Sequence, residues 1–240
     1  MRSKTQAIVL HVTHYADNKS IVHLYTRDFG RVDYVVYGVG SRRGKWKKSL
    51  LEPLTVLNIE VNHQAIEMLQ RIDDVQLAQI NVNLAADIKK RTICLFVAEL
   101  LYKVLKHPMR DAELFDFLVY AIQTLEQCEA PHNFHISFLL RLTQFLGFYP
   151  DFSSRGQWLD LRTGVKNFGM PLHPDCISTE HTILLEQIAM SEDLSASEVS
   201  LSRADRRALL DILILYYSLH LDSFYTLKSL DILAAVFEYE

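Results

Sequence analysis

The densest group of side chains that could do chemistry lies in the glycine-flanked segment 38–48, Gly-Val-Gly-Ser-Arg-Arg-Gly-Lys-Trp-Lys-Lys. It carries five cations around one indole: Arg42, Arg43, Lys45, Lys47 and Lys48, with Trp46. Flexible cations neutralise phosphates without reading bases, and an exposed indole stacks on an unpaired base for roughly 1 to 3 kcal/mol. The segment therefore predicts a contact site for single-stranded nucleic acid. The alternative is a solvated basic loop whose tryptophan is partly buried.

A second basic group has the i, i+3, i+4 spacing that places side chains on one face of a helix: Arg203, Arg206 and Arg207. The opposite face of the same segment is apolar. Arginines beside an apolar groove can bind the carboxylates of an acidic peptide, and Arg141 and Lys228 are further candidates for the same rim. The alternative is that these arginines are only the solvated face of a helix.

Other motifs give little support for catalysis. The glycines of segment 38–48 do not lead into the Gly-Lys-Ser/Thr helix start of a nucleotide-binding P-loop. The pair Asp73-Asp74 lacks the second acidic cluster of a two-metal nuclease, and we expect it in a solvated turn between a strand and a helix. His173 and Cys176 have the spacing of half a zinc site, but no second ligand pair precedes them. We therefore expect no enzyme activity, no cofactor and no zinc.

The first part of the chain is patterned for strands. Short β-rich runs bounded by turn residues occur at 5–12, 20–26, 31–37, 55–61 and 65–72. In the fourth run Leu57, Ile59 and Val61 share one face, which is the period-two pattern of a half-buried strand. Five short strands in about seventy residues fit a small closed barrel of the OB type.

From about residue 80 the apolar period becomes 3.6, which predicts a helix that ends at His107-Pro108. Further helices are predicted at 111–127, 131–147, 179–190, 202–221 and 228–237. Segment 148–176 holds three of the six prolines and no helical period, so we interpret it as a long loop or β-excursion. The expected class is α+β, with an OB-type domain at 1–79 and a helical domain at 80–240.

Charge and cysteine usage narrow the class of protein. Residues 1–60 hold ten lysines and arginines against five aspartates and glutamates, a net +5, so the formal −4 of the whole chain leaves −9 for residues 61–240. The basic surface is therefore local to the predicted barrel. The three cysteines form no disulfide framework, and we find neither a signal peptide nor the ~18 apolar residues of a membrane span. A cytoplasmic protein without membrane contact is expected.

Several pieces of sequence, in this order, resemble the RecO family of DNA-repair proteins. They are Ala-Ile-Val-Leu-His at 7–11, Tyr-Ala-Asp-Asn-Lys-Ser-Ile-Val-His-Leu-Tyr-Thr-Arg-Asp-Phe-Gly-Arg at 15–31, Tyr-Gly-Val-Gly-Ser-Arg-Arg at 37–43, Leu-Glu-Pro-Leu at 51–54, Leu-Leu-Arg-Leu-Thr-Gln-Phe-Leu-Gly-Phe-Tyr-Pro-Asp at 139–151, and Leu-Lys-Ser-Leu at 227–230.

The resemblance implies an N-terminal OB fold that binds single- and double-stranded DNA, with the basic contacts carried over onto Arg42 and Arg43. It also implies a helical domain that binds the acidic tail of single-stranded-DNA-binding protein. Strand annealing and, with RecR, the loading of RecA at gaps would follow without a nucleotide, at the nucleoid. Family members with a four-cysteine zinc module place it in the loop equivalent to 152–176, where this sequence keeps only Cys176.

We therefore predict a recombination mediator. One alternative is a scaffold protein whose barrel binds acidic protein partners. Another is an RNA-binding protein, because an OB groove does not distinguish ribose from deoxyribose by its fold alone.

Overall fold

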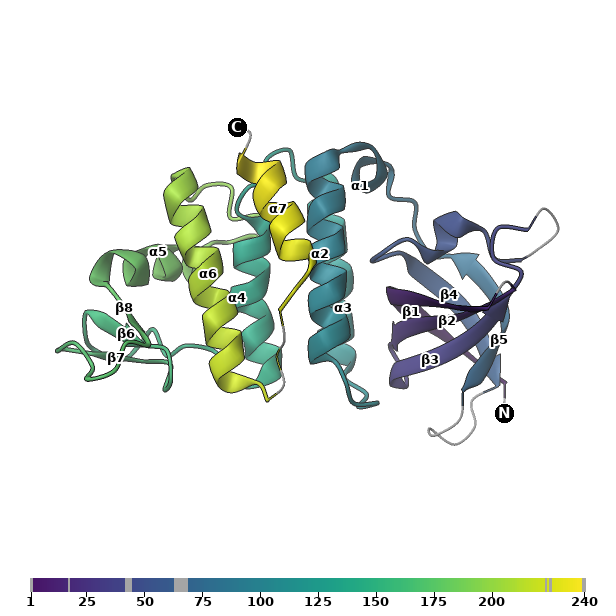
Figure 1. Cartoon of the computed structure of the whole chain (residues 1–240), viewed down its shortest axis with the longest axis horizontal. Coiled ribbons are helices and arrows are strands. Elements are labelled where there is room, and N and C mark those ends of the chain that lie inside the picture. The colour runs from purple at the N-terminus through teal and green to yellow at the C-terminus, as the bar shows by residue number, and fades with distance from the viewer. Residues whose placement is uncertain are drawn as a thin grey trace. The chain divides into compact units, whose positions relative to one another are not determined.

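The computed structural model in Figure 1 describes residues 2–16, 18–41, 45–62, 69–222, 224 and 226–238. By its internal contacts the chain divides into two units: Met1–Glu126 with Leu227–Leu233, and Gln127–Thr226 with Ala234–Glu240. The predicted α+β class, a barrel followed by a helical region, is confirmed. The expected domain boundary after residue 79 stays a prediction; by contacts, the first three helices group with the barrel.

A closed five-stranded barrel opens the first unit. Its strands are β1 (Arg2–Ala16), β2 (Lys19–Thr26), β3 (Gly30–Tyr37), β4 (Val56–Asn62) and β5 (Gln70–Leu77). Their order around the barrel is β1-β2-β3-β5-β4, and every pair is antiparallel except β3 with β5, which is parallel. This arrangement is of the OB type, as predicted.

The long strand β1 closes the barrel because it pairs along both of its edges. Residues 2–8 pair with β4 and residues 7–16 pair with β2. A register shift between Val9 and His11 marks the irregularity at which the strand can change direction. The strand is therefore longer at both ends than the predicted 5–12.

The fifth strand lies later in the chain than predicted, at 70–77 instead of 65–72, and residues 63–68 lie outside the described part of the structure. The prediction that Asp73-Asp74 forms a turn is wrong, because both residues belong to β5. Their carboxylates are tolerated there because they point to solvent and because Arg2 of β1 contacts Asp73 at 3.6 Å and Glu60 at 3.9 Å.

Three helices complete most of the first unit: α1 (Val82–Ala86), α2 (Ile88–Val104) and α3 (Ala112–Gln127). The Asp87 carboxylate accepts hydrogen bonds from the backbone N–H groups of Lys89 and Lys90, which starts α2 separately from α1. The single helix predicted from residue 80 is thus two helices, and the second ends before Pro108 as predicted. Helix α2 packs against β1.

The second unit is built around α4 (Phe134–Leu146), which packs against α5 (Thr179–Met190) and α6 (Arg203–His220). Helix α4 ends at Gly147, as predicted, with that residue in the left-handed conformation. A capping box of Ser202 and Asp205 begins α6, close to the start of the helix predicted at 202–221. A last helix, α7 (Ser229–Glu238), begins within the first unit.

Segment 148–176 contributes strands, which confirms the β-excursion. It holds β6 (Trp158–Asp160) and β7 (Val165–Asn167), and these pair with β8 (Cys176–Ile177) in the order β7-β6-β8. The small sheet packs on α5 through β6, so it belongs to the second unit (Figure 1).

Candidate nucleic-acid interface

Trp46 fixes the cation loop, as we name residues 38–48, to the barrel. Its side chain is only 6% exposed and lies in the same apolar core as Val36 and Leu51. Its carbonyl oxygen accepts a hydrogen bond from the N–H of Gly40 at 2.8 Å. An indole covered in this way cannot stack on a base, so the structure contradicts the predicted stacking role of Trp46 and supports the alternative of a buried tryptophan.

The buried indole determines where the neighbouring lysines point. Lys45 and Lys47 flank Trp46 in an extended stretch and are exposed, and Lys48 begins a short 3-10 helix, η1 (Lys48–Leu51). The stem of Lys48 lies against Gly40, where the Cβ of any other residue would come within 3.2 Å of the Lys48 Cε. This close approach and the φ of +75° favour glycine at that position. Within the described residues, neither Lys47 nor Lys48 forms an ion pair.

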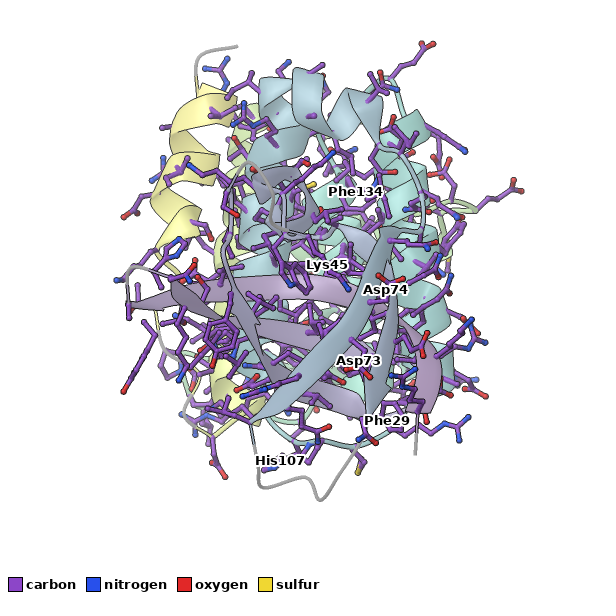
Figure 2. All side chains as sticks on the ribbon, turned by 90° about the vertical axis from the view of Figure 1, so that its right-hand side faces the viewer. Phe29, Lys45, Asp73, Asp74, His107 and Phe134 are labelled. Carbon is purple, nitrogen blue, oxygen red and sulfur yellow. The ribbon has the colours of Figure 1, made fainter. Side chains whose placement is uncertain are left out.

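Lys45 differs from the other two lysines because it contacts β5. Its Nζ donates to the carbonyl oxygen of Asp73 at 3.0 Å and lies 4.0 Å from Oδ1 of Asp74. Figure 2 shows these three side chains on the barrel. The ion pair is exposed and worth little energy, but it offsets the charge of Lys45. Lys47 and Lys48 are therefore the more available cations, and Arg42 and Arg43 lie outside the described residues.

Two cavities open on the barrel. One of about 390 Å³ is lined by Lys48 together with His14, Asn18 and Ser20 at the β1–β2 hairpin. The other, of about 500 Å³, mixes cations and anions among its lining residues: Lys4, Arg27, Asp28, Glu60 and Asp74. The first cavity holds one cation, Lys48, against one anion, Glu52, whereas the second holds three anions against two cations. The hairpin end of the barrel is therefore the less acidic of the two places.

The second predicted group of cations lies on the first turns of α6. Arg203 and Arg207 are exposed, while Arg206 is half-buried and donates from Nη1 to the carbonyl oxygen of Leu201 at 2.8 Å. Burial, followed by repulsion from Arg203, lowers the pKa of Arg206. Arg206 therefore supports the start of α6, and the predicted binding of an acidic peptide by this group stays a prediction.

The two further rim candidates have structural surroundings of their own. Arg141 of α4 is half-buried and donates from Nη2 to the carbonyl oxygen of Ser191 at 2.6 Å, at the end of α5. Lys228 belongs to the first unit, where its N–H donates to Glu99 at 3.0 Å. The bond of Arg141 ties two helices of the second unit together, and the predicted roles of Arg141 and Lys228 at the rim stay predictions.

His173 and Cys176, the predicted half of a zinc site, are occupied with other contacts. Nε2 of His173 lies 3.3 Å from Oδ2 of Asp160, and the thiol of Cys176 lies 3.6 Å from the carbonyl oxygen of His173. No group of three or more histidine, cysteine, aspartate or glutamate side chains suited to a metal occurs among the described residues. The absence of zinc stays a prediction for elemental analysis.

Comparison with known proteins decides the family. The family model described as "Recombination protein O N terminal" matches residues 1–81, and "Recombination protein O C terminal" matches residues 85–231. The chain belongs to the RecO family. The RecO resemblance seen in the sequence is thereby confirmed.

RecO proteins of similar length match the chain from end to end. The "DNA repair protein RecO" of Azobacteroides pseudotrichonymphae is 33% identical over 241 residues, covering 99% of this chain and 100% of that protein. The protein of the same name from Porphyromonas gingivalis is 36% identical over 242 residues, covering 98% of each. That of Flavobacterium psychrophilum is 33% identical over 240 residues, covering 99% and 100%. None of the described helices is long and apolar enough to cross a bilayer.

Two exposed tyrosines and one half-buried lysine at the hairpin end of the RecO-type barrel are missing from the sequence prediction: Tyr15 and Tyr37, with Lys19. Tyr15 and Lys19 lie outside the strands predicted at 5–12 and 20–26, but Tyr15 belongs to β1 and Lys19 to β2. Alternation in β3, where Val32, Tyr34 and Val36 point inward, could have marked Tyr37 as outward-facing.

Proposed function

We propose that this RecO-family chain is a recombination mediator and not an enzyme. In this proposal the barrel binds single- and double-stranded DNA, the protein anneals complementary strands, and with RecR it helps to load RecA at gaps. It works in the cytoplasm, at the nucleoid, without a cofactor. The observation that carries the DNA-binding part is the Trp46 anchor, which presents Lys47 and Lys48 to solvent without an ion pair to any described residue.

The charge distribution supports this choice of site. Residues 61–240 carry a net −9 and repel a polyanion as a whole, so attraction must come from the first 60 residues, with their net +5. Half of the ten cations in that part lie in the cation loop. Lysines without an ion pair in the protein are neutralised by counterions from the solvent. Phosphates displace these counterions, so the affinity for DNA falls as the salt concentration rises.

The helical part is proposed to bind the acidic C-terminal tail of single-stranded-DNA-binding protein. Support comes from Arg203 and Arg207, which are exposed on one turn of α6. Guanidinium groups can bind the carboxylates of such a tail in pairs. Arg206 stabilises the turn that carries them, because its guanidinium donates to the carbonyl oxygen of Leu201.

A titration of the full-length protein tests the proposal. Single-stranded DNA, duplex DNA and single-stranded RNA of equal length are each titrated at several salt concentrations, and annealing of complementary strands is followed in parallel. We expect salt-dependent binding to both DNAs, weaker binding to RNA, and faster annealing. Salt-independent or absent DNA binding would favour a protein scaffold, and preference for RNA would favour an RNA-binding factor; either result overturns the proposal.

A further inference from the structure

Tyr15, Lys19 and Tyr37 form a row across three neighbouring strands of the barrel. Tyr15 lies on β1 and is 69% exposed, and Tyr37 lies at the end of β3 and is 49% exposed. Between them, on β2, Lys19 places its Nζ 5.0 Å from the centre of the Tyr15 ring and is the cross-strand partner of Tyr37. We name these three residues the tyrosine row.

The pleat of β2 and β3 directs Lys19 and Tyr37 toward the same outer face. Ser20 and Val22 of β2 and Val36 of β3 are buried on the inner side of the barrel, so their neighbours Lys19 and Tyr37 face solvent. Directly opposed residues of antiparallel strands lie about 5 Å apart and share one face. Lys19 therefore lies beside Tyr37 on this face, and its Nζ lies over the ring of Tyr15.

The outer face of β2 and β3 is covered by a ring of α2 at the end far from the tyrosine row, but not at the row itself. His23 of β2 and Arg31 of β3 contact the ring of Tyr102 on α2, at 5.0 Å and 4.5 Å, within the first unit. No such ring covers Tyr15 or Tyr37 among the described residues. The two tyrosines thus mark the part of this sheet face that remains accessible.

The tyrosine row adjoins the cation loop along the chain and through a hydrogen bond. The loop begins at Gly38, directly after Tyr37, and the N–H of Gly38 donates to the carbonyl oxygen of Asn18 at 3.1 Å. Asn18 also lines the same cavity as Lys48. A strand whose phosphates contact the loop can therefore reach the row with its neighbouring nucleotides.

We propose that Tyr15 and Tyr37 stack on unpaired bases of single-stranded DNA while Lys19 contacts the phosphate between them; this rests on the proposed DNA binding. Two strand spacings separate the tyrosines by about 10 Å, well beyond the 3.4 Å repeat of stacked bases. The row therefore fits bases that have been pulled apart. Paired bases inside a duplex cannot reach it, so the row should favour single strands over duplex DNA.

The experiment uses the full-length protein and three ligands of equal length: single-stranded DNA, an abasic strand with the same phosphates, and duplex DNA. We expect the parent to bind the abasic strand at least about 5- to 150-fold more weakly than the normal strand, because that is the range for one stacked base and the row would hold two. The double variant Tyr15→Ala/Tyr37→Ala should lose this difference, with its affinity for abasic and duplex DNA and its salt dependence unchanged. Tyr15→Phe/Tyr37→Phe should retain the difference, since a phenyl ring still stacks.

Tyr120→Ala is the matched control, because Tyr120 is a 47%-exposed tyrosine on α3; it should bind all three ligands like the parent. If the folded double-alanine variant still discriminates against the abasic strand as the parent does, the row is not the stacking site, although the proposed function stands. If its affinity for all three ligands falls equally, the row acts through structure or charge and the inference is also overturned. If the parent protein binds no DNA, both this inference and the proposed function are overturned.

Discussion

The guanidinium of Arg31 on β3 lies 4.5 Å from the centre of the Tyr102 ring on α2. The same guanidinium donates to the carbonyl oxygens of Tyr102 and Leu105, at 3.1 and 3.2 Å, where α2 ends. Its Nε bonds Asp33 at 3.2 Å, which fixes the orientation of the side chain. One cation thus satisfies carbonyl groups that the helix leaves unpaired and joins the barrel to α2.

Removal of this cation should destabilise the first unit. The Arg31 side chain is only 11% exposed, so we expect Arg31→Ala to lower the free energy of unfolding by about 2 to 4 kcal/mol, from charged hydrogen bonds and the contact with the ring. Arg27→Ala is the control: Arg27 pairs with Asp116 of α3, but both are exposed, and its loss should cost less than about 1 kcal/mol. Urea unfolding measures both, and equal losses would refute the assignment.

His135 should make the protein less stable in acid. Burial, with repulsion from Arg206 and His132, lowers the pKa of His135 to about 3. Below about pH 6.5 the imidazole of His135 is protonated in the unfolded chain but stays neutral in the folded chain. The free energy of unfolding is therefore unaffected by this group above pH 6.5 and decreases as the pH falls toward 3. His135→Leu should flatten the stability profile between pH 6.5 and 4, whereas His107→Leu, at an exposed position, should not. An unchanged profile for His135→Leu would contradict this.

Trp46 should behave as a core residue. We expect Trp46→Ala to cost about 3 to 5 kcal/mol of stability and to weaken DNA binding only by loosening the loop. The sequence has two tryptophans, so in a Trp158→Phe background all tryptophan fluorescence comes from Trp46. Acrylamide should quench this fluorescence only weakly, with or without single-stranded DNA, because the indole is buried. Ready quenching by acrylamide, relieved by DNA, would show that the indole is exposed and contacts the bases.

Arg203 and Arg207 should decide binding of an acidic tail. The probe is a synthetic peptide with the C-terminal sequence of single-stranded-DNA-binding protein, titrated into the full-length chain. Arg203→Glu/Arg207→Glu should weaken it at least about tenfold, since two cations become anions facing the peptide carboxylates. Arg155→Glu changes an exposed arginine elsewhere in the second unit and should have little effect. Parental affinity in the double variant would remove α6 from the peptide site.

Periodicity was sufficient to predict most of the fold. Alternation located four of the five barrel strands, and the 3.6 period located the helices. The fifth strand of the barrel was misplaced because Asp73 and Asp74 are unfavourable strand residues. They are tolerated there because both are exposed and because Arg2 contacts Asp73 and Lys45 contacts Asp74.

The site was harder to predict than the fold. An isolated tryptophan among lysines has no periodic partners, so the sequence could not show that Trp46 points into the barrel. The row of Tyr15, Lys19 and Tyr37 depends on the register of three strands, which alternation alone does not determine. Residue types indicated a nucleic-acid site, but the side chain expected to stack was the wrong one.

The salt dependence of single-stranded DNA binding tests the central claim most directly. Each neutralised phosphate of a single strand contributes about 0.7 to the slope of log affinity against log salt. Lys47→Ala/Lys48→Ala should flatten the slope by about 1.4, and alanine at Arg42, Arg43, Lys45, Lys47 and Lys48 together by roughly 2 to 3.5. Arg91→Ala/Arg155→Ala, which removes two exposed cations outside the barrel, should leave it unchanged. A folded five-alanine variant with the parental affinity and slope would show that DNA does not bind the cation loop.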